Sequence, residues 1–139
     1  MKKIVLSLVF IGISYFSNAQ SDLEQITETI NHYMEGTSNG EPDRIKEAFH
    51  ENLNLYSITE DQTLKTWNGK EYISIFKEGQ KNNRVGRIIS IDFENNAAIA
   101  KAEILIPGKK LYTDYFMLLK IEGEWKIVHK AYTSRALPL

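Results

Sequence analysis

The chain has 139 residues, of which 42% are hydrophobic and 25% charged, with a formal net charge of −1 and no cysteine. This length suits a single domain, and the lack of cysteine excludes disulfides and thiolate chemistry. The slightly acidic balance lacks the basic excess of nucleic-acid-binding proteins, so no nucleic-acid partner is expected.

Residues 1–19 predict a secretory signal peptide. Lys2 and Lys3 form a basic start, residues 4–16 are an almost unbroken apolar run, and Ser17-Asn18-Ala19 supplies small residues for cleavage. The run is shorter than the roughly 20 apolar residues that span a bilayer. We therefore expect cleavage after Ala19, a single domain at residues 20–139, and a secreted or periplasmic protein without membrane attachment. A retained N-terminal anchor is the alternative.

Helical periodicity opens the expected domain. Ser21 or Asp22 can cap a helix whose apolar face is Leu23, Ile26, Ile30, Tyr33 and Met34. The sequence GTSNG at residues 36–40 predicts a break. Pro42 then suits the first turn of a short second helix, whose apolar face is Ile45, Ala48 and Phe49.

Strand signals dominate the rest of the chain. Short strands are expected at residues 53–58 and 64–67, around a turn at 59–62, followed by a third helix at 71–77. The basic segment 77–87 indicates a solvated loop, and from residue 84 onward alternating strands are separated by turns at 94–96, 107–108 and 122–124. Early helices and late antiparallel strands predict an α+β fold with helices on one face of a sheet.

Asp114 is the sharpest functional candidate. Period-two alternation places it on one strand face with Tyr112, Phe116 and Leu118, so a carboxylate lies among large apolar side chains. A buried carboxylate needs compensating partners, which favours a pocket residue that can donate or accept a hydrogen bond. The alternatives are an exposed strand end or an ion pair with a lysine or arginine.

His129 is a second catalytic candidate. Alternation puts it on one face with Trp125 and Ile127 and near the level of Asp114, where an Asp–His pair could serve as general acid and base. A hydrogen-bonded core histidine is the alternative. The three histidines show no metal-ligand spacing, so neither a metal nor another cofactor is expected. The pocket lining is expected to include Tyr33, Phe49, Tyr56, Trp67 and Phe116.

Three segments in order resemble the NTF2-like superfamily, which includes SnoaL-like polyketide cyclases and ketosteroid isomerases. They are AFHENLNL (48–55), WNGKEYISIF (67–76) and YTDYFMLLKIEGEWKIVHKAY (112–132). The last is most similar to exported bacterial proteins labelled putative lumazine-binding. The resemblance implies a cone-shaped α+β fold whose bent sheet surrounds a pocket closed by the N-terminal helices.

The resemblance also implies roles for individual residues. Tyr33 and Asp114 match the two groups of the ketosteroid isomerase oxyanion hole. The place of the isomerase's carboxylate base holds Ser57, which cannot act as that base, and Glu60 and Asp61 follow in the expected turn.

Three functional hypotheses follow. The first is an exported protein that binds a small apolar or heteroaromatic ligand in a largely apolar pocket. The second is an isomerase, cyclase or dehydratase that uses Asp114, His129 and Tyr33. The third is a non-catalytic association module. Because the outer face of the late strand is also apolar, a homodimer through the sheet is expected, covering Thr113, Tyr115, Met117 and Leu119.

Overall fold

The computed structural model describes residues 20–137, so the predicted signal peptide lies outside the described residues. The elements in chain order are α1 (Asp22–Asn39), α2 (Pro42–Ala48), β1 (Phe49–Ile58), β2 (Leu64–Asn68), α3 (Gly69–Ser74), β3 (Val85–Glu94), β4 (Ala97–Ile106), β5 (Lys110–Ile121) and β6 (Glu124–Ala136). No helix in this part of the chain is long and apolar enough to cross a membrane.

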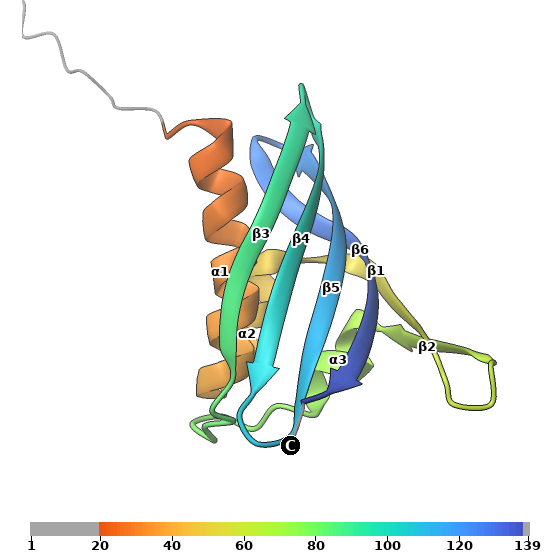
Figure 1. Ribbon diagram of the computed structural model, residues 1–139. Coiled ribbons are helices and arrows are strands. Elements are labelled where there is room, and N and C mark those ends of the chain that lie inside the picture. The colour runs from red at the N-terminus through yellow and green to blue at the C-terminus, as the bar shows by residue number, and fades with distance from the viewer. Residues whose placement is uncertain (1–19, 138–139) are drawn as a thin grey trace, which may run out of the picture.

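The strands form one six-stranded sheet in the order β2-β1-β6-β5-β4-β3. All neighbouring strands are antiparallel except β1 and β6, which run parallel. The sheet is curved, α1 and α2 lie behind it, and α3 lies near the end where β2 projects (Figure 1). The predicted α+β fold, with its helices on one face of the sheet, is confirmed.

Helix α1 is longer than the sequence pattern predicted. It starts at a capping box between Ser21 and Glu24, runs through the expected break, and ends at Asn39, where Gly40 caps it with φ of +69°. Gly36 lies inside this helix, facing α2. Its position requires a glycine, because a Cβ there would come within 2.7 Å of Cγ1 of Ile45 in α2. This glycine allows two helices to approach closely instead of ending one of them.

Further boundaries differ from the expectations, among them the end of the third helix, which lies at Ser74 instead of residue 77. Phe49, expected on the second helix, is the first residue of β1, so α2 ends at Ala48. The third helix begins earlier than predicted, at Gly69, because the Asn68 side chain accepts a hydrogen bond from the Glu71 backbone N–H and forms a capping box with it.

The faces of β5 are as predicted. Asp114, Phe116 and Leu118 are buried on the inner face, whereas Tyr115, Met117 and Leu119 are exposed on the outer one. The inner face packs against the helices, and the core includes Ile26 and Ile30 of α1 together with Ile104, Leu118 and Ile127 of the sheet.

The faces of β6 are not as predicted, because the strand contains a β-bulge. Met117 pairs with His129 and Leu118 pairs with Ile127, so Val128 has no partner of its own across the ladder. Beyond this point Lys130, not His129, is buried on the inner face. The expected Asp114–His129 pair is therefore wrong. Instead, the His129 ring lies 4.8 Å from the ring of Tyr56.

Candidate ligand-binding site

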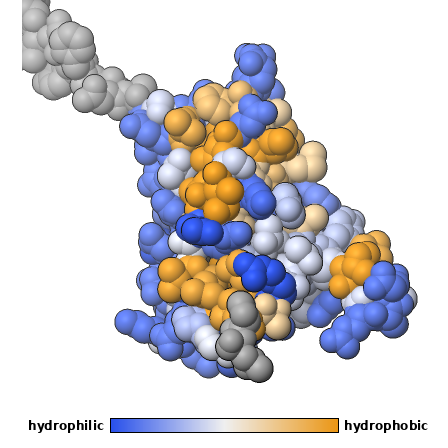
Figure 2. Space-filling view, viewed as in Figure 1, coloured by the Kyte–Doolittle hydropathy of each residue, from blue (hydrophilic) through white to orange (hydrophobic). Residues whose placement is uncertain are grey.

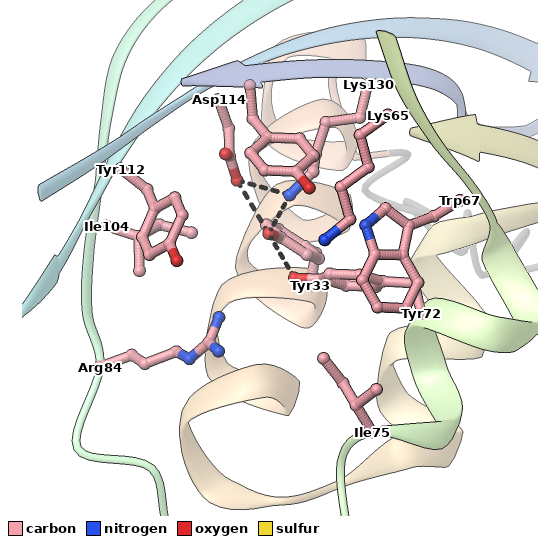
Figure 3. Close-up of a pocket in the computed structure, with 11 residues that line it drawn as sticks. Tyr33, Lys65, Trp67, Tyr72, Ile75, Arg84, Ile104, Tyr112, Asp114 and Lys130 are labelled. Atoms are coloured by element: carbon pink, nitrogen blue, oxygen red, sulfur yellow. Dashed lines mark hydrogen bonds and ion pairs between the residues drawn. The ribbon is translucent and has the colours of Figure 1, made fainter. Parts of the chain in front are cut away.

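A partly open cavity of about 150 Å³ lies between the helices and the inner face of the sheet. Every layer of the fold contributes to its wall, and Figure 3 shows the contributing side chains converging on one space. The lining residues are Tyr33, Lys65, Trp67, Tyr72, Ile75, Arg84, Ile104, Tyr112, Asp114, Lys130 and Tyr132.

A buried hydrogen-bond network forms one side of this cavity. Oδ2 of Asp114 accepts from the Tyr33 hydroxyl at 2.8 Å and from Nζ of Lys130 at 3.0 Å. Lys130 also donates to the Tyr33 oxygen at 2.6 Å, and the Tyr33 and Tyr72 hydroxyls lie 3.1 Å apart. Because the single hydroxyl proton of Tyr33 goes to Asp114, Tyr72 must donate to Tyr33.

Burial and charge together set the protonation of this network. Burial raises the pKa of the Tyr33 hydroxyl well above its ordinary value, and the nearby Asp114 carboxylate raises it further. Burial alone would lower the pKa of the Lys130 ammonium, but the attraction of Asp114 outweighs that effect and the pKa is raised. At neutral pH, Tyr33 is therefore a neutral donor and Lys130 a cation.

Three aromatic rings surround the Lys130 ammonium. Its Nζ lies 4.7 Å from the ring centroid of Tyr33 and 4.9 Å from those of Tyr72 and Tyr132. Cation–π contacts at these distances favour the charged form of the lysine. They reinforce the role of Asp114 in holding a permanent positive charge at the cavity wall.

Three buried polar atoms of the cavity have no protein partner. They are Oδ1 of Asp114, Nε1 of Trp67 and Nε of Arg84, and they are all such side-chain atoms found within residues 20–137. All three residues line the same cavity. Leaving a buried polar group unsatisfied costs about 1–3 kcal/mol, so these atoms are expected to bond to water or to a ligand.

Two further cations stand at the cavity wall. The Arg84 guanidinium lies 5.0 Å from the centroid of the Phe76 ring, and Nζ of Lys65 lies 4.6 Å from that of Trp67. Neither forms a salt bridge with a carboxylate of the described residues, in contrast to Lys130 and Asp114.

The predicted site residues divide into three groups. Tyr33, Trp67 and Asp114 line the cavity, and the structure brings Tyr33 and Asp114 into direct contact. Phe49 and Phe116 lie outside the lining and pack against the Tyr33 ring, with centroids at 5.4 and 5.5 Å. Tyr56 and His129 contact each other and are also absent from the lining, because both lie on strand positions that face away from it.

Several lining residues were missed from the sequence. Tyr112 could have been found, because it shares the predicted face of Asp114. Lys130 could not, because the bulge at Val128 reverses its face. Arg84 belongs to the segment that was predicted to be a solvated loop, and no pattern in the sequence marks it as different from its basic neighbours. The cavity is accordingly more charged than the largely apolar pocket that was expected.

A larger and more open hollow of about 570 Å³ lies between α2, α3 and the start of β1. Phe49 and His50 contribute to its wall. None of the three unpartnered buried atoms belongs to its lining, so the smaller cavity is the better candidate for specific binding.

The sequence model of one family, described as putative lumazine-binding, matches residues 21–133. The chain belongs to this family. An NTF2-like protein from Shewanella baltica is similar in structure, with a TM-score of 0.75, 22% identity, and coverage of 86% of this chain and 100% of the other. Another, from Methylobacillus flagellatus, has a TM-score of 0.72, 28% identity, and coverage of 83% and 93%. This member of the family thus has the NTF2-like fold.

A curated relative is the aldolase FrzH of Cladobotryum sp., which is 26% identical over 116 residues. The match covers 82% of this chain and 92% of the relative.

Proposed function

We propose that this NTF2-like protein binds a small, flat aromatic molecule, with an all-carbon or a heteroaromatic ring, in the cavity beside Tyr33, Asp114 and Lys130. The observation that carries the proposal is that the three unpartnered buried atoms share one cavity. Asp114 offers an acceptor and Trp67 a donor, while aromatic rings supply flat walls. A ring that carries N–H and C=O groups on its edge, as lumazine does, meets both requirements. The family description favours the same class of ligand.

Native mass spectrometry of protein purified from its own host tests this proposal. We expect an additional small mass that disappears on denaturation. Ile75 lies at the cavity wall and is half exposed, so Ile75→Trp should fill the cavity without disturbing the core. Ile58→Trp is a matched control at an exposed position on β1. The bound mass should be lost in the first variant and kept in the second. Retention in both would place the ligand elsewhere.

A second candidate is carbon–carbon bond or isomerase chemistry, supported by the aldolase relative and by the convergence of Tyr33, Asp114 and Lys130. In this proposal Oδ1 of Asp114 takes a proton from a carbon next to a carbonyl. The electron pair moves to the carbonyl oxygen, where a cavity cation stabilises the enolate. The raised pKa of Lys130 disfavours a Schiff base, which requires the neutral amine.

A solvent-exchange experiment distinguishes this catalytic proposal from simple binding. Cyclic ketones incubated with the protein in deuterated water should exchange their α-protons, and Asp114→Asn should abolish that exchange. Borohydride should trap no covalent adduct on Lys130. If the protein binds a ketone but exchanges none of its α-protons, the catalytic proposal fails and only the binding proposal remains.

Export and self-association complete the proposed function. We propose that residues 1–19 are removed, so that protein recovered from the periplasm or medium begins at Gln20, which N-terminal sequencing would detect. We also propose that the outer face of the sheet forms a homodimer.

A further inference from the structure

The charges of the cavity do not cancel. Asp114 is paired with Lys130, which leaves Arg84 and Lys65 as two positive charges without a carboxylate partner among the described residues. The whole chain, by contrast, has a formal charge of −1. The positive excess is therefore a local property of this cavity and favours an anionic ligand.

The position of the Arg84 side chain suits the binding of a planar anion. Its guanidinium is positioned beside the Phe76 ring, and its buried Nε has no protein partner. A guanidinium presents parallel N–H groups in a rigid plane, which match the two oxygens of a carboxylate. In Figure 3 Arg84 reaches into the cavity from the side away from Asp114.

Asp114 requires a hydrogen-bond donor from the ligand, whereas Arg84 requires an anionic acceptor. Its side chain is about 1% exposed, and Oδ2 already accepts from Tyr33 and Lys130. Oδ1 is free to accept one more hydrogen bond. A ligand carboxylate would be repelled at this position, whereas a hydroxyl or N–H would be bound. The cavity therefore distinguishes the two ends of a ligand.

The size of the cavity limits the ring system. A cavity of about 150 Å³ accommodates a molecule of roughly the size of benzene. The walls that Trp67, Tyr72 and Tyr112 form suit an aromatic ring, which can stack or meet them edge-on. A two-ring molecule such as lumazine would extend towards solvent past Ile75.

We propose that the cavity selects a monocyclic aromatic carboxylic acid that carries a ring hydroxyl or N–H. Its carboxylate pairs with Arg84 and Lys65, and its donor bonds to Oδ1 of Asp114. This inference rests on the proposed binding function and narrows the class of ligand.

Calorimetry on the mature protein with para-hydroxybenzoate as the probe tests the inference. Two analogues each remove one feature: para-hydroxybenzamide lacks the charge, and benzoate lacks the donor. The dissociation constant of each analogue should be at least about tenfold higher than that of para-hydroxybenzoate, as expected for the loss of a charge-assisted hydrogen bond. Arg84→Gln should abolish the preference for the acid over the amide. Arg87→Gln is the matched control, because Arg87 is an exposed arginine paired with Glu103.

Lumazine serves as the comparison ligand in the same titrations. Equal affinity for acid and amide would overturn the inference, as would an unchanged preference in Arg84→Gln. Binding of lumazine or the amide, without the acid, would overturn the inference but leave the binding function intact. If no probe binds to protein that unfolds cooperatively, the inference also fails, and native mass spectrometry then decides the binding function independently.

Discussion

The ion pair between Lys130 and Asp114 lies almost fully out of contact with solvent, with 3% and 1% of the two side chains exposed. A buried pair of this kind contributes little net stability, but breaking it leaves one uncompensated charge. We expect Asp114→Leu and Lys130→Met each to lower the free energy of unfolding by about 3–5 kcal/mol in urea denaturation.

The double variant provides the control for that prediction. Asp114→Leu combined with Lys130→Met leaves no buried charge and should recover much of the loss caused by either change alone. If the double variant instead lost as much stability as the two single variants together, the pair would not be coupled, contrary to its geometry.

Alkaline pH should destabilise the protein through the same network. The pKa values of Tyr33 and Lys130 are raised in the folded state above ordinary values of 10.0 and 10.5, so the folded state holds these protons more tightly than the unfolded state. Their contribution is complete below about pH 10 and is lost as the pH rises through the folded-state pKa values. Urea midpoints measured across this range should fall above about pH 10.

The Tyr33→Phe variant separates the two groups. It removes the tyrosine proton but keeps the Lys130–Asp114 ion pair, so the decline with pH should be shallower than in the wild type. Identical slopes in the two proteins would mean that Tyr33 does not contribute. Tyr115→Phe, at an exposed tyrosine on the outer face of β5, should retain the full decline.

At the scale of elements, the end of α1 depends on the loop that follows α3. Gly40 has φ of +69°, and a Cβ there would come within 2.4–2.6 Å of backbone atoms of Gln80 and Lys77. Gly79 has a similar φ of +73° but no atom within 4 Å of its Cβ position. We expect Gly79→Ala to cost about 1–2 kcal/mol, from backbone strain alone.

Gly40→Ala should cost roughly 3 kcal/mol or more, because overpacking adds to the same strain. The comparison isolates the packing of this loop, measured as the difference in unfolding free energy between the two variants. Because the loop leads to Arg84, Gly40→Ala should also weaken the binding of an anionic ligand. Equal losses of stability would contradict a close packing of the loop on the helix end.

The bulge in β6 shows which parts of the site could be predicted. Tyr33 and Asp114 follow regular 3.6- and two-residue periods, so their faces can be derived from spacing. Lys130 lies beyond Val128, where one extra residue exchanges the two faces of the strand. Sequence alternation cannot detect a bulge that depends on pairing with β5 and on twist. His129 was therefore placed inside, and the lysine that completes the network was placed outside.

At the scale of the molecule, the order of the elements and the family resemblance were enough to predict the fold. They did not predict the content of the cavity, because its lining comes from distant segments, among them Lys65 on β2 and Arg84 before β3. Only the curvature of the folded sheet brings these segments together. A filled interior was expected for the association module, so the cavity supports the proposal of ligand binding.

The outer face of the sheet carries the last prediction. Apolar side chains gather on this face in Figure 2, and Ile99, Met117 and Leu119 are 41–59% exposed there. A two-fold dimer would remove these neighbouring side chains from water in both copies. We expect the mature protein to form a dimer in size-exclusion chromatography with light scattering. Met117→Glu should convert it to a monomer, because charges would face each other across the interface.

Ile58→Glu is the matched control for this experiment, since Ile58 is 62% exposed on β1, outside the group formed by Ile99, Met117 and Leu119. It should leave the dimer intact. A wild-type protein that remains monomeric at its highest soluble concentration would contradict the proposed interface. A dimer that persists in Met117→Glu but dissociates in Ile58→Glu would instead assign the contact to the β1–β2 hairpin, where Ile58 pairs with the equally exposed Leu64.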